Sequence, residues 1–283
     1  MNIFEAYNHA KKTLQKAGIE DFSFEARQII RHLTGYSNAQ IISKYTENLT
    51  EFQKSNLTVI LRQREIRYPL QYALGSWSFF GRDYSVGPGV LIPRQDTEVL
   101  VDCALEFLKN KPDARVIDLC TGTGCIGITL ACEYKDAAVD LLEKYEEAAR
   151  YASRNIADNK AFNATLYMGD VLEGTRNDNK YDLIVSNPPY IPKNEMETVS
   201  PEVKYEPETA LLGGDDGLVF YRAIIDNYKN SLSSGGMLCF EVGIGEAEAV
   251  AKLMENAGFC NVGVKQDYNS IYRVVFGTAN SIE

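Results

Sequence analysis

The segment best suited to carry chemistry is Asn187-Pro188-Pro189-Tyr190, which directly follows the apolar run Tyr181–Ser186. Two consecutive prolines fix two φ angles and donate no backbone N–H, so their carbonyl groups are left exposed in a rigid turn. The side chain of Asn187 adds another acceptor. Two acceptors held close together suit a primary amide or an amino group, and the ring of Tyr190 offers a face for a flat substrate group.

Such a group is a poor nucleophile because its nitrogen lone pair is delocalised. Acceptors that draw both hydrogens toward them increase the electron density on nitrogen and aim it at an electrophile, so positioning and fixed dipoles supply the catalysis. No strong base is needed, because the surplus proton becomes acidic once the nitrogen is alkylated. We interpret Asn187, Pro188 and Tyr190 as candidate catalytic residues and Pro189 as a further substrate contact. A plain proline turn is the competing interpretation.

A second candidate is the glycine-containing loop Asp118–Gly127, which follows the apolar run Arg115–Leu119. Glycines at a strand-to-helix turn permit a tight bend and let a ligand approach the backbone. In open parallel sheets, ligands bind beyond the carboxyl ends of the strands at such a turn. The spacing of Gly122, Gly124 and Gly127 resembles a dinucleotide-binding fingerprint.

Acidic residues at the ends of the next two strands are candidates for polar contacts to a nucleoside. Asp140 and Glu143 both lie about 20 residues past the glycines, where an acid can accept bonds from ribose hydroxyls. We favour Glu143, because it falls at the expected strand end, whereas Asp140 falls within the strand. Asp170 follows the third strand, where it can accept a bond from the exocyclic amine of adenine. A surface acid at a helix start and an Asp turn cap are the structural alternatives.

The elements that must position these residues alternate between strand and helix from Arg94 onward. Alternation of this kind predicts a mostly parallel sheet covered by helices on both faces. The expected strands are Arg115–Leu119, Ala137–Leu142, Ala164–Met168, Tyr181–Ser186, Met237–Val242, Cys260–Lys265 and Tyr272–Phe276.

The N-terminal residues have a purely helical pattern. Apolar residues recur at helical spacing from Ile3 to Leu14. A second helix is expected to follow Ser23 and to stop near Gly35, and a last one to run from about Glu51 to Arg67. Capping boxes are expected at Ser37 with Gln40 and at Thr50 with Gln53. Residues 74–93 mix aromatics with glycines, which indicates a β-hairpin. We therefore expect a helical domain over 1–73, a hairpin linker over 74–93 and an α/β domain over 94–283.

Charge is unevenly distributed between these parts. Residues 1–73 contain ten basic and seven acidic side chains, a net charge of +3. Because the whole chain has a net charge of −10, the remaining residues carry a net charge of −13. A protein that grips long nucleic acid usually presents a basic face, and an acidic catalytic part argues against that class. The densest basic cluster, Arg62, Arg64 and Arg67, is expected to form a solvated helix face.

Metal, membrane and export functions find no support in the sequence. Six cysteines without a Cys-x-x-Cys pair and only two histidines do not make a zinc site. No apolar run approaches the roughly 20 residues that cross a bilayer. The N-terminus lacks the pattern of a signal peptide, so we expect a cytoplasmic location.

Together these motifs resemble the PrmC/HemK family of class I methyltransferases. Beyond the two loops, the resemblance is carried by Pro69–Gly75, Val90–Arg94 with Thr97-Glu98, Glu206-Pro207 with Ala210-Leu211, and Gly213–Leu218. It covers nearly the whole chain, whereas Asn-Pro-Pro-Tyr alone is shared with DNA adenine methyltransferases. The resemblance implies a Rossmann-like seven-stranded sheet with its last strand antiparallel, a hairpin linker and a small helical domain.

The resemblance also implies an activity, namely methyl transfer from S-adenosylmethionine to the side-chain amide of the glutamine in the Gly-Gly-Gln motif of peptide chain release factors 1 and 2. It assigns the substrate glutamine to the Asn187–Tyr190 segment. It assigns the cofactor to Cys120, Thr121, Gly122, Thr123, Gly124, Glu143, Asp170, Val171 and Asn187.

Three positions depart from the family pattern. Cys120 stands where the family usually has Gly, Gln95 where it has Pro, and Glu246 where it commonly has Gln. The first could alter how closely the loop approaches the cofactor, and the second loosens the chain near the active site. Neither of these two touches the acceptor pair.

Three other functions remain open on the sequence. The first is methylation of an exocyclic amine in a flipped nucleic-acid base, and the second is glutamine methylation of a ribosomal protein. The third is a binding module without catalysis, against which the intact Asn187–Tyr190 segment and cofactor loop both count.

Overall fold

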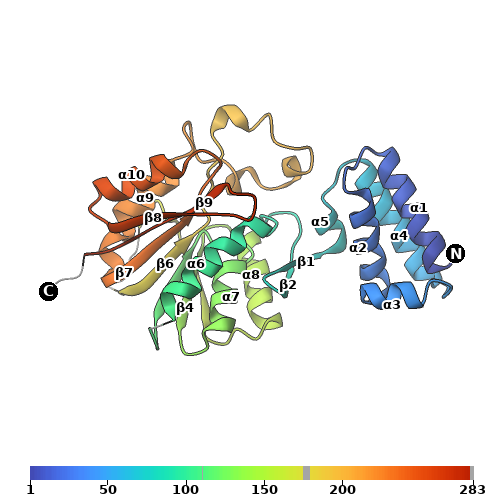
Figure 1. Ribbon diagram of the computed structural model, residues 1–283, viewed down its shortest axis with the longest axis horizontal. Coiled ribbons are helices and arrows are strands. Elements are labelled where there is room, and N and C mark those ends of the chain that lie inside the picture. Colours follow the sequence, from blue (N-terminus) through green and yellow to red (C-terminus); the bar gives the residue numbers. More distant parts are fainter. Residues whose placement is uncertain (110, 175–178, 281–283) are drawn as a thin grey trace. The chain divides into compact units, whose positions relative to one another are not determined.

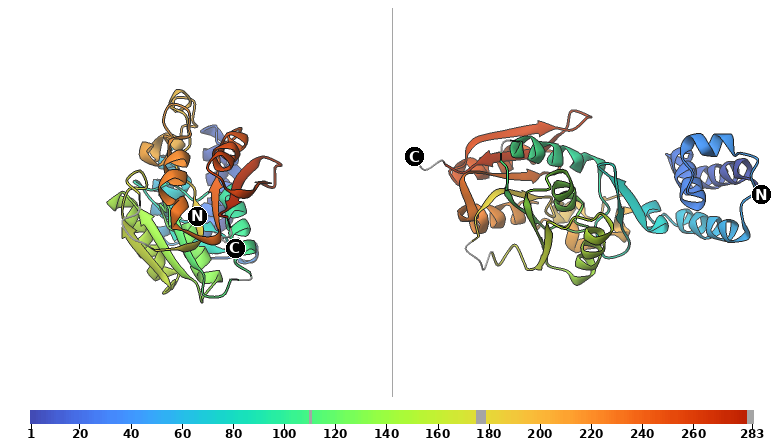
Figure 2. Two further views of the ribbon diagram at one scale, coloured as in Figure 1. Left: turned by 90° about the vertical axis from the view of Figure 1, so that its left-hand side faces the viewer. Right: turned by 90° about the horizontal axis from the view of Figure 1, so that it is seen from below.

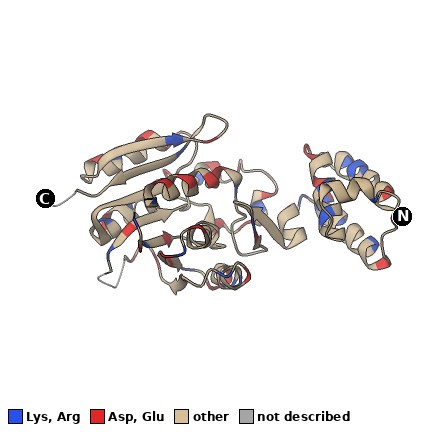
Figure 3. Ribbon diagram, turned by 60° about the horizontal axis from the view of Figure 1, so that its bottom comes forward, with Lys and Arg blue, Asp and Glu red and all other residues tan. Residues whose placement is uncertain are grey.

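A computed structural model describes residues 1–109, 111–174 and 179–280 of the chain. It divides into two compact units. One contains Met1–Ser76 together with Ser200–Tyr205, and the other contains Trp77–Val199 and Glu206–Glu283. In Figure 3, basic and acidic positions both occur along the helices of each unit.

The first unit is helical. Its helices are α1 (Ile3–Lys16), α2 (Phe22–Thr34), α3 (Asn38–Ser43), α4 (Glu51–Glu65) and α5 (Leu70–Leu74), as Figure 1 shows. The buried side of α1 consists of Ile3, Ala6, Ala10 and Leu14, which confirms its helical spacing. Both expected capping boxes are present at the starts of α3 and α4.

Three details of this unit differ from the sequence-based expectation. Helix α2 begins at Phe22 with Asp21 before it, so Ser23 lies inside its first turn. Helix α4 ends at Glu65, and Arg67 then adopts a left-handed φ of 64°. The short helix α5 was not anticipated; it ends at Leu74 and is followed by Gly75, whose φ is 74°.

The expectation of a solvated basic face is wrong for Arg64, which is only 2% exposed. Its guanidinium donates two hydrogen bonds to Glu25, at 2.8 and 2.9 Å, and one to Glu202 at 3.2 Å. Arg67 also binds Glu202, with Nε 2.7 Å from a carboxylate oxygen. A planar guanidinium matches carboxylates in this bidentate way, so burial is compensated by pairing. These bonds hold the Ser200–Tyr205 segment in the helical unit.

The second unit opens with a hairpin of β1 (Ser76–Phe79) and β2 (Arg82–Ser85), which form a two-stranded sheet. The large sheet contains β3 (Arg115–Leu119), β4 (Ala138–Glu143), β5 (Ala164–Met168), β6 (Tyr181–Ser186), β7 (Leu232–Glu241), β8 (Cys260–Gln266) and β9 (Tyr272–Thr278). Its order is β5-β4-β3-β6-β7-β9-β8, with β9 antiparallel to both of its neighbours. The seven-stranded, mostly parallel sheet with an antiparallel last strand is therefore confirmed.

Helices cover both faces of this sheet (Figure 1, Figure 2). Helices α6 (Glu98–Leu108) and α7 (Cys125–Glu133) contribute to one core cluster with one face of the strands. Helices α9 (Val219–Tyr228) and α10 (Ala247–Asn256) contribute to a second cluster on the other face. Helix α8 (Glu146–Asp158) follows β4 and packs its Ile156 against the first cluster.

The strand order reverses between β3 and β6. From β3 the chain proceeds to β4 and β5 on one side, and it then returns to place β6 on the other side. At such a switch point the loops beyond the carboxyl ends of the two central strands diverge and leave a crevice for a ligand. The loop after β3 begins with Cys120 and the loop after β6 begins with Asn187, so both predicted motifs lie at this crevice.

Candidate active site

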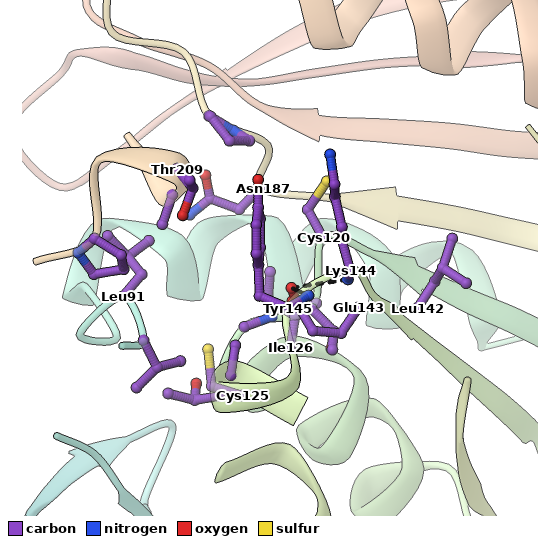
Figure 4. A pocket seen from close by; sticks show the side chains of 18 of the residues that line it. Leu91, Cys120, Cys125, Ile126, Leu142, Glu143, Lys144, Tyr145, Asn187 and Thr209 are labelled. Atoms are coloured by element: carbon purple, nitrogen blue, oxygen red, sulfur yellow. Dashed lines mark hydrogen bonds between the residues drawn. The ribbon is translucent and has the colours of Figure 1, made fainter. Parts of the chain in front are cut away.

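A pocket lies at the carboxyl ends of β3, β4 and β6, within the second unit. It holds about 920 Å³ of empty space, including the part open to solvent. Most of the predicted cofactor residues line it, as do two residues of the proline motif. They are Cys120, Thr121, Gly122, Thr123, Glu143, Asp170, Val171, Asn187 and Pro189. Figure 4 shows Cys120, Glu143, Lys144, Tyr145 and Asn187 around this space.

Three predicted residues do not line the pocket. Gly124 is the residue before helix α7, where its φ of 79° and the closeness of Ile128 and Leu141 leave no room for a side chain. Pro188 is buried. The ring of Tyr190 lies beside Gly243 and packs against the second core cluster. The substrate-facing role of Tyr190 stays a prediction.

Asp118 stabilises the glycine loop from inside the fold. Its Oδ2 accepts hydrogen bonds from the hydroxyl of Thr121 at 2.5 Å and from the backbone N–H of Gly127 at 2.9 Å. Complete burial raises the pKa of this carboxyl to about 7, although the two donors act in the opposite direction. Asp118 therefore connects both ends of the loop without lining the pocket.

Glu143 is the last residue of β4 and is only 6% exposed. One of its oxygens accepts from the backbone N–H groups of Lys144 and Tyr145, both at 2.9 Å, and the other accepts from Gly122 N–H at 2.9 Å. A carboxylate offers about four acceptor positions, so at least one remains for a ligand hydroxyl. Its bond to Gly122 also ties the end of β4 to the glycine loop.

Asp140 occupies a different environment. It lies within β4, opposite Ile117 and Thr165, and accepts a hydrogen bond from the buried hydroxyl of Tyr181 at 2.9 Å. It is not among the residues that line the pocket. The structure therefore gives Asp140 a place in the core and Glu143 a place at the pocket.

Asp170 follows β5 and lies on the pocket wall. Its Oδ1 accepts from Leu172 N–H at 2.9 Å, and its Oδ2 lies 2.8 Å from Lys144 Nζ. Partial burial would raise the pKa of Asp170, but the bonds from Lys144 and Leu172 hold it below its usual value. The acid is thus ionised at neutral pH and can accept a bond from an amino group.

Asn187 has an unused acceptor. Its Nδ2 donates to the hydroxyl of Thr97 at 3.4 Å, while its Oδ1 is buried and has no partner among the residues that the structure describes. Buried polar atoms without a partner are uncommon in folded proteins and call for an explanation. A donor on a bound substrate would satisfy this oxygen, as the two-acceptor interpretation requires.

Part of the pocket wall comes from two motifs that lie far apart in the sequence. Glu206 accepts from Ile92 N–H at 2.9 Å and pairs with the guanidinium of Arg94. Pro207, Thr209 and Ala210 continue this wall.

Two residues that contact the site were given no role by the sequence analysis. Thr97 precedes α6 and Glu241 ends β7; both are 2% exposed. The only signal for Glu241 was an acid inside the otherwise apolar run Met237–Val242. Thr97 appeared only as part of the Thr97-Glu98 motif, whose spacing does not reveal its contact with Asn187.

The three departures from the family pattern lie in different surroundings. Cys120 has a φ of 58°, a left-handed conformation in which glycine is free of strain. Gln95 is exposed in the short turn Gln95–Thr97. Glu246 accepts from Gly243 N–H at 2.9 Å, and burial raises its pKa to about 7.

Comparison with known proteins identifies the family. Residues 5–75 match the PrmC N-terminal domain, and residues 96–203 match the methyltransferase small domain. The release factor glutamine methyltransferase of Geobacter sulfurreducens is 40% identical over 266 residues, which cover 93% of this chain and 92% of that one. That of Clostridium acetobutylicum is 32% identical over 285 residues and covers both chains completely.

The chain belongs to the release factor glutamine methyltransferase family. It is a methyltransferase that uses S-adenosylmethionine, as the family resemblance implied. Its fold is shared with a Pyrococcus furiosus methyltransferase, at a TM-score of 0.52 and 17% identity over 82% of this chain and all of that one. The catalytic domain of hMettl16 matches at a TM-score of 0.59 and 14% identity, covering 88% of this chain and 94% of that one. At these identities the likeness concerns the fold alone.

The pocket of this methyltransferase fits its cofactor on chemical grounds. A nucleoside needs acceptors for its hydroxyls and its amino group, and the carboxylates of Glu143 and Asp170 line the pocket at the ends of β4 and β5. The glycine loop after β3 lets a ligand approach the backbone closely.

Within the described residues, no helix is long and apolar enough to cross a membrane.

Proposed function

We propose that this protein methylates the side-chain amide of the glutamine in the Gly-Gly-Gln motif of peptide chain release factors 1 and 2, and so supports translation termination in the cytoplasm. The observation that carries the proposal is the unpartnered Oδ1 of Asn187 on the wall of the cofactor pocket. The relatives are named release factor glutamine methyltransferases, which supports a release factor as the substrate.

The proposed roles of the residues follow from their chemistry. Cys120, Thr121, Gly122, Thr123, Gly124, Glu143, Asp170, Val171 and Asn187 hold S-adenosylmethionine, which when bound supplies an electrophilic methyl group on a sulfonium. Asn187 Oδ1 and the Pro188 carbonyl accept the two amide hydrogens. This arrangement orients the amide lone pair and increases its electron density. Pro189 and Tyr190 bound the space for the flat amide, and the proton that nitrogen loses after alkylation passes to water.

We assign substrate recognition to residues 1–73, with 74–93 as the linker and 94–283 as the methyltransferase domain. The amide site alone would accept any primary amide, so selectivity for one glutamine requires contacts elsewhere, and remote contacts can raise turnover. The charge of +3 on the helical segment, against −13 on the remainder, supports a separate purpose for its surface.

The central experiment incubates the full-length protein with methyl-labelled S-adenosylmethionine and purified release factor, followed by peptide mapping. Label is expected on the glutamine of Gly-Gly-Gln and is expected to vanish when that glutamine is replaced by alanine. Parallel incubations contain ribosomal proteins, RNA or DNA. Label in one of those and none in release factor would overturn the proposal.

Asn187→Ala tests the assigned acceptor in the same assay. We expect it to lower turnover on the order of 100-fold or more, as the loss of a preorganised partner of the transition state does. Cofactor affinity, measured by calorimetry, should stay largely intact, because the eight other residues assigned to the cofactor are unchanged in this variant. Near-normal turnover of this variant would remove Asn187 from the chemistry.

A charge-reversal variant tests the recognition role. Arg27, Arg31 and Arg62 are exposed on the helical unit. Changing all three to Glu should raise KM for intact release factor and leave KM for a short Gly-Gly-Gln peptide unchanged. Arg150→Glu, at an exposed position of α8 in the other unit, is the control. Equal effects on protein and peptide would contradict a docking role.

A further inference from the structure

The Asn187 amide contacts two buried side chains, Thr97 on the pocket wall and, through it, Glu241. Asn187 donates from Nδ2 to Thr97 Oγ1 at 3.4 Å. The Thr97 hydroxyl is in turn the side-chain donor that acts against the burial-raised pKa of the Glu241 carboxyl. The three residues come from the loop after β6, the turn before α6 and the end of β7. They are brought together because β6 and β7 are neighbours in the sheet, where Ser186 pairs with Phe240.

The direction of these bonds follows from the capacities of the groups. An ionised carboxylate can only accept, so Thr97 must give its single hydrogen to Glu241. The threonine oxygen can then only accept from Asn187, and of the two ends of the amide only Nδ2 can donate. Oδ1 is thereby turned away from Thr97, and it is the atom left without a partner among the described residues.

An amide without this constraint can rotate by half a turn and present its N–H₂ group where the substrate needs an acceptor. The N–H₂ group of Asn187 would then face the N–H₂ group of the substrate amide. Both groups are donors, so the substrate hydrogens would have no acceptor on that side. Such a rotation leaves the shape of the pocket unchanged, because the two ends of the amide are nearly identical in size.

We infer that Thr97 and Glu241 are positioning residues, which hold the Asn187 amide with its oxygen available to accept from the substrate amide. Neither residue takes part in bond making. Thr97 acts on Asn187 directly, and Glu241 acts by accepting the hydroxyl hydrogen of Thr97. This inference rests on the proposed role of Asn187 as an acceptor.

The surroundings of Glu241 support the assignment. Burial raises the pKa of its carboxyl to about 7, with the bond from Thr97 acting in the opposite direction. Its Oε2 is buried and accepts no hydrogen bond from the described residues. The other titratable groups that face it are Arg273, Asp96, Arg94, Tyr190, Tyr221 and Cys125.

Protonation of Glu241 would change which of these side chains donate hydrogen bonds and which accept them. A neutral carboxyl can donate to Thr97, which frees the threonine hydrogen to turn toward Asn187. Thr97 could then donate to Oδ1 of Asn187 as readily as it accepts from Nδ2, and the preference for one amide orientation would be lost. The benefit of Thr97 should therefore depend on pH.

The test compares Thr97→Val, Thr97→Ser and wild type in the full-length protein with intact release factor. Valine keeps the shape of threonine and removes the hydroxyl. We expect kcat of Thr97→Val to fall roughly fivefold to tenfold, as the loss of one hydrogen bond allows, with KM for release factor little changed. Thr97→Ser retains the hydroxyl and should recover most of the turnover.

Thr129→Val is the matched control. Thr129 is also fully buried and hydrogen-bonded, to the carbonyl of Cys125 and to Tyr84, but it lies outside the pocket. We expect its kcat to stay within about twofold of wild type. An equal fall in Thr97→Val and Thr129→Val would show that loss of any buried hydroxyl damages the enzyme, and that result would overturn the inference.

The pH dependence separates positioning from a structural effect. The ratio of wild-type kcat to Thr97→Val kcat should be large at about pH 8.5 and approach one at about pH 5.5, across the titration of Glu241. Taking the ratio cancels the titration of other groups such as Asp118. A ratio that does not change with pH would remove Glu241 from the proposal.

Failure of this inference is distinguishable from failure of the proposed function. If wild type does not methylate release factor, the proposed function fails before any variant is compared. If wild type does so, and Thr97→Val matches it within about twofold or Thr97→Ser is as impaired as Thr97→Val, the positioning role alone is wrong.

Discussion

Leu119 and Ser186 lie directly opposite each other at the ends of β3 and β6, and the hydroxyl of Ser186 donates to the carbonyl of Leu119 at 2.8 Å. The next residue of each strand begins a functional loop, Cys120 on one side and Asn187 on the other. The bond therefore holds the ends of β3 and β6 together at the point where the cofactor loop and the Asn187–Tyr190 segment diverge.

Removing this bond should cost stability. We expect Ser186→Ala to lower the free energy of unfolding by about 1 kcal/mol, the usual net value of an intramolecular hydrogen bond. Denaturant unfolding measures the change. Ser153→Ala, an exposed serine on α8, is the control and should stay within about 0.5 kcal/mol. Equal stability of the two variants would show that the Ser186 bond contributes nothing.

Glu143 and Asp140 should differ in their effects on the cofactor. Glu143→Gln keeps the side-chain shape but removes the charge at the pocket, so we expect a loss of roughly 1.5–3 kcal/mol in S-adenosylmethionine binding. Asp140→Asn alters a residue bound to Tyr181 in the core and should change affinity little. Calorimetric titration of both variants decides the matter, and the reverse ranking would mean that the wrong acid was chosen.

The left-handed conformation of Cys120 predicts a difference between two small substitutions. Both Cys120→Gly and Cys120→Ala remove the thiol, but only glycine is unstrained at a φ of 58°. Relief of about 1–2 kcal/mol of strain exceeds the chain-entropy cost of glycine, about 0.4–1 kcal/mol. The glycine variant should thus be more stable than the alanine variant, by roughly 0.5–1 kcal/mol in denaturant unfolding. A more stable alanine variant would argue against strain at this position.

Glu241 predicts a pH-dependent stability. Its pKa lies at about 7 in the fold, against an ordinary value of 4.5, so the folded state binds the extra proton between these two pH values. The stability that this proton contributes is present in full below pH 4.5. It is lost as the pH rises toward 7, at about 1.4 kcal/mol per pH unit. Glu241→Gln does not titrate, so its advantage over wild type should grow across this window and level off above it.

Unfolding of wild type and Glu241→Gln at a series of pH values checks this prediction. Asp118 has a similarly raised pKa and remains in both proteins, so its contribution cancels in the difference. A difference that is constant from pH 4.5 to 7 would show that Glu241 titrates normally in the fold.

The sequence alone determined the sheet, the pocket loops and the family. Long apolar runs separated by helical patterns predict their own elements, because local spacing decides which side of an element is buried. All seven strands of the sheet are found where expected, although β7 begins at Leu232 instead of Met237. The Asn187–Tyr190 and Asp118–Gly127 motifs are contiguous, so they can be found by following the chain from one residue to the next.

Only the tertiary structure decided which side chains surround these motifs. Asn187 lies 90 residues after Thr97, and Glu241 comes from a third element, so no local pattern records their contact. Arg64 likewise looked like part of a solvated face, because its partners Glu25 and Glu202 are 39 and 138 residues away. Burial and pairing are properties of the packed chain, and the charge pattern of a single helix does not contain them.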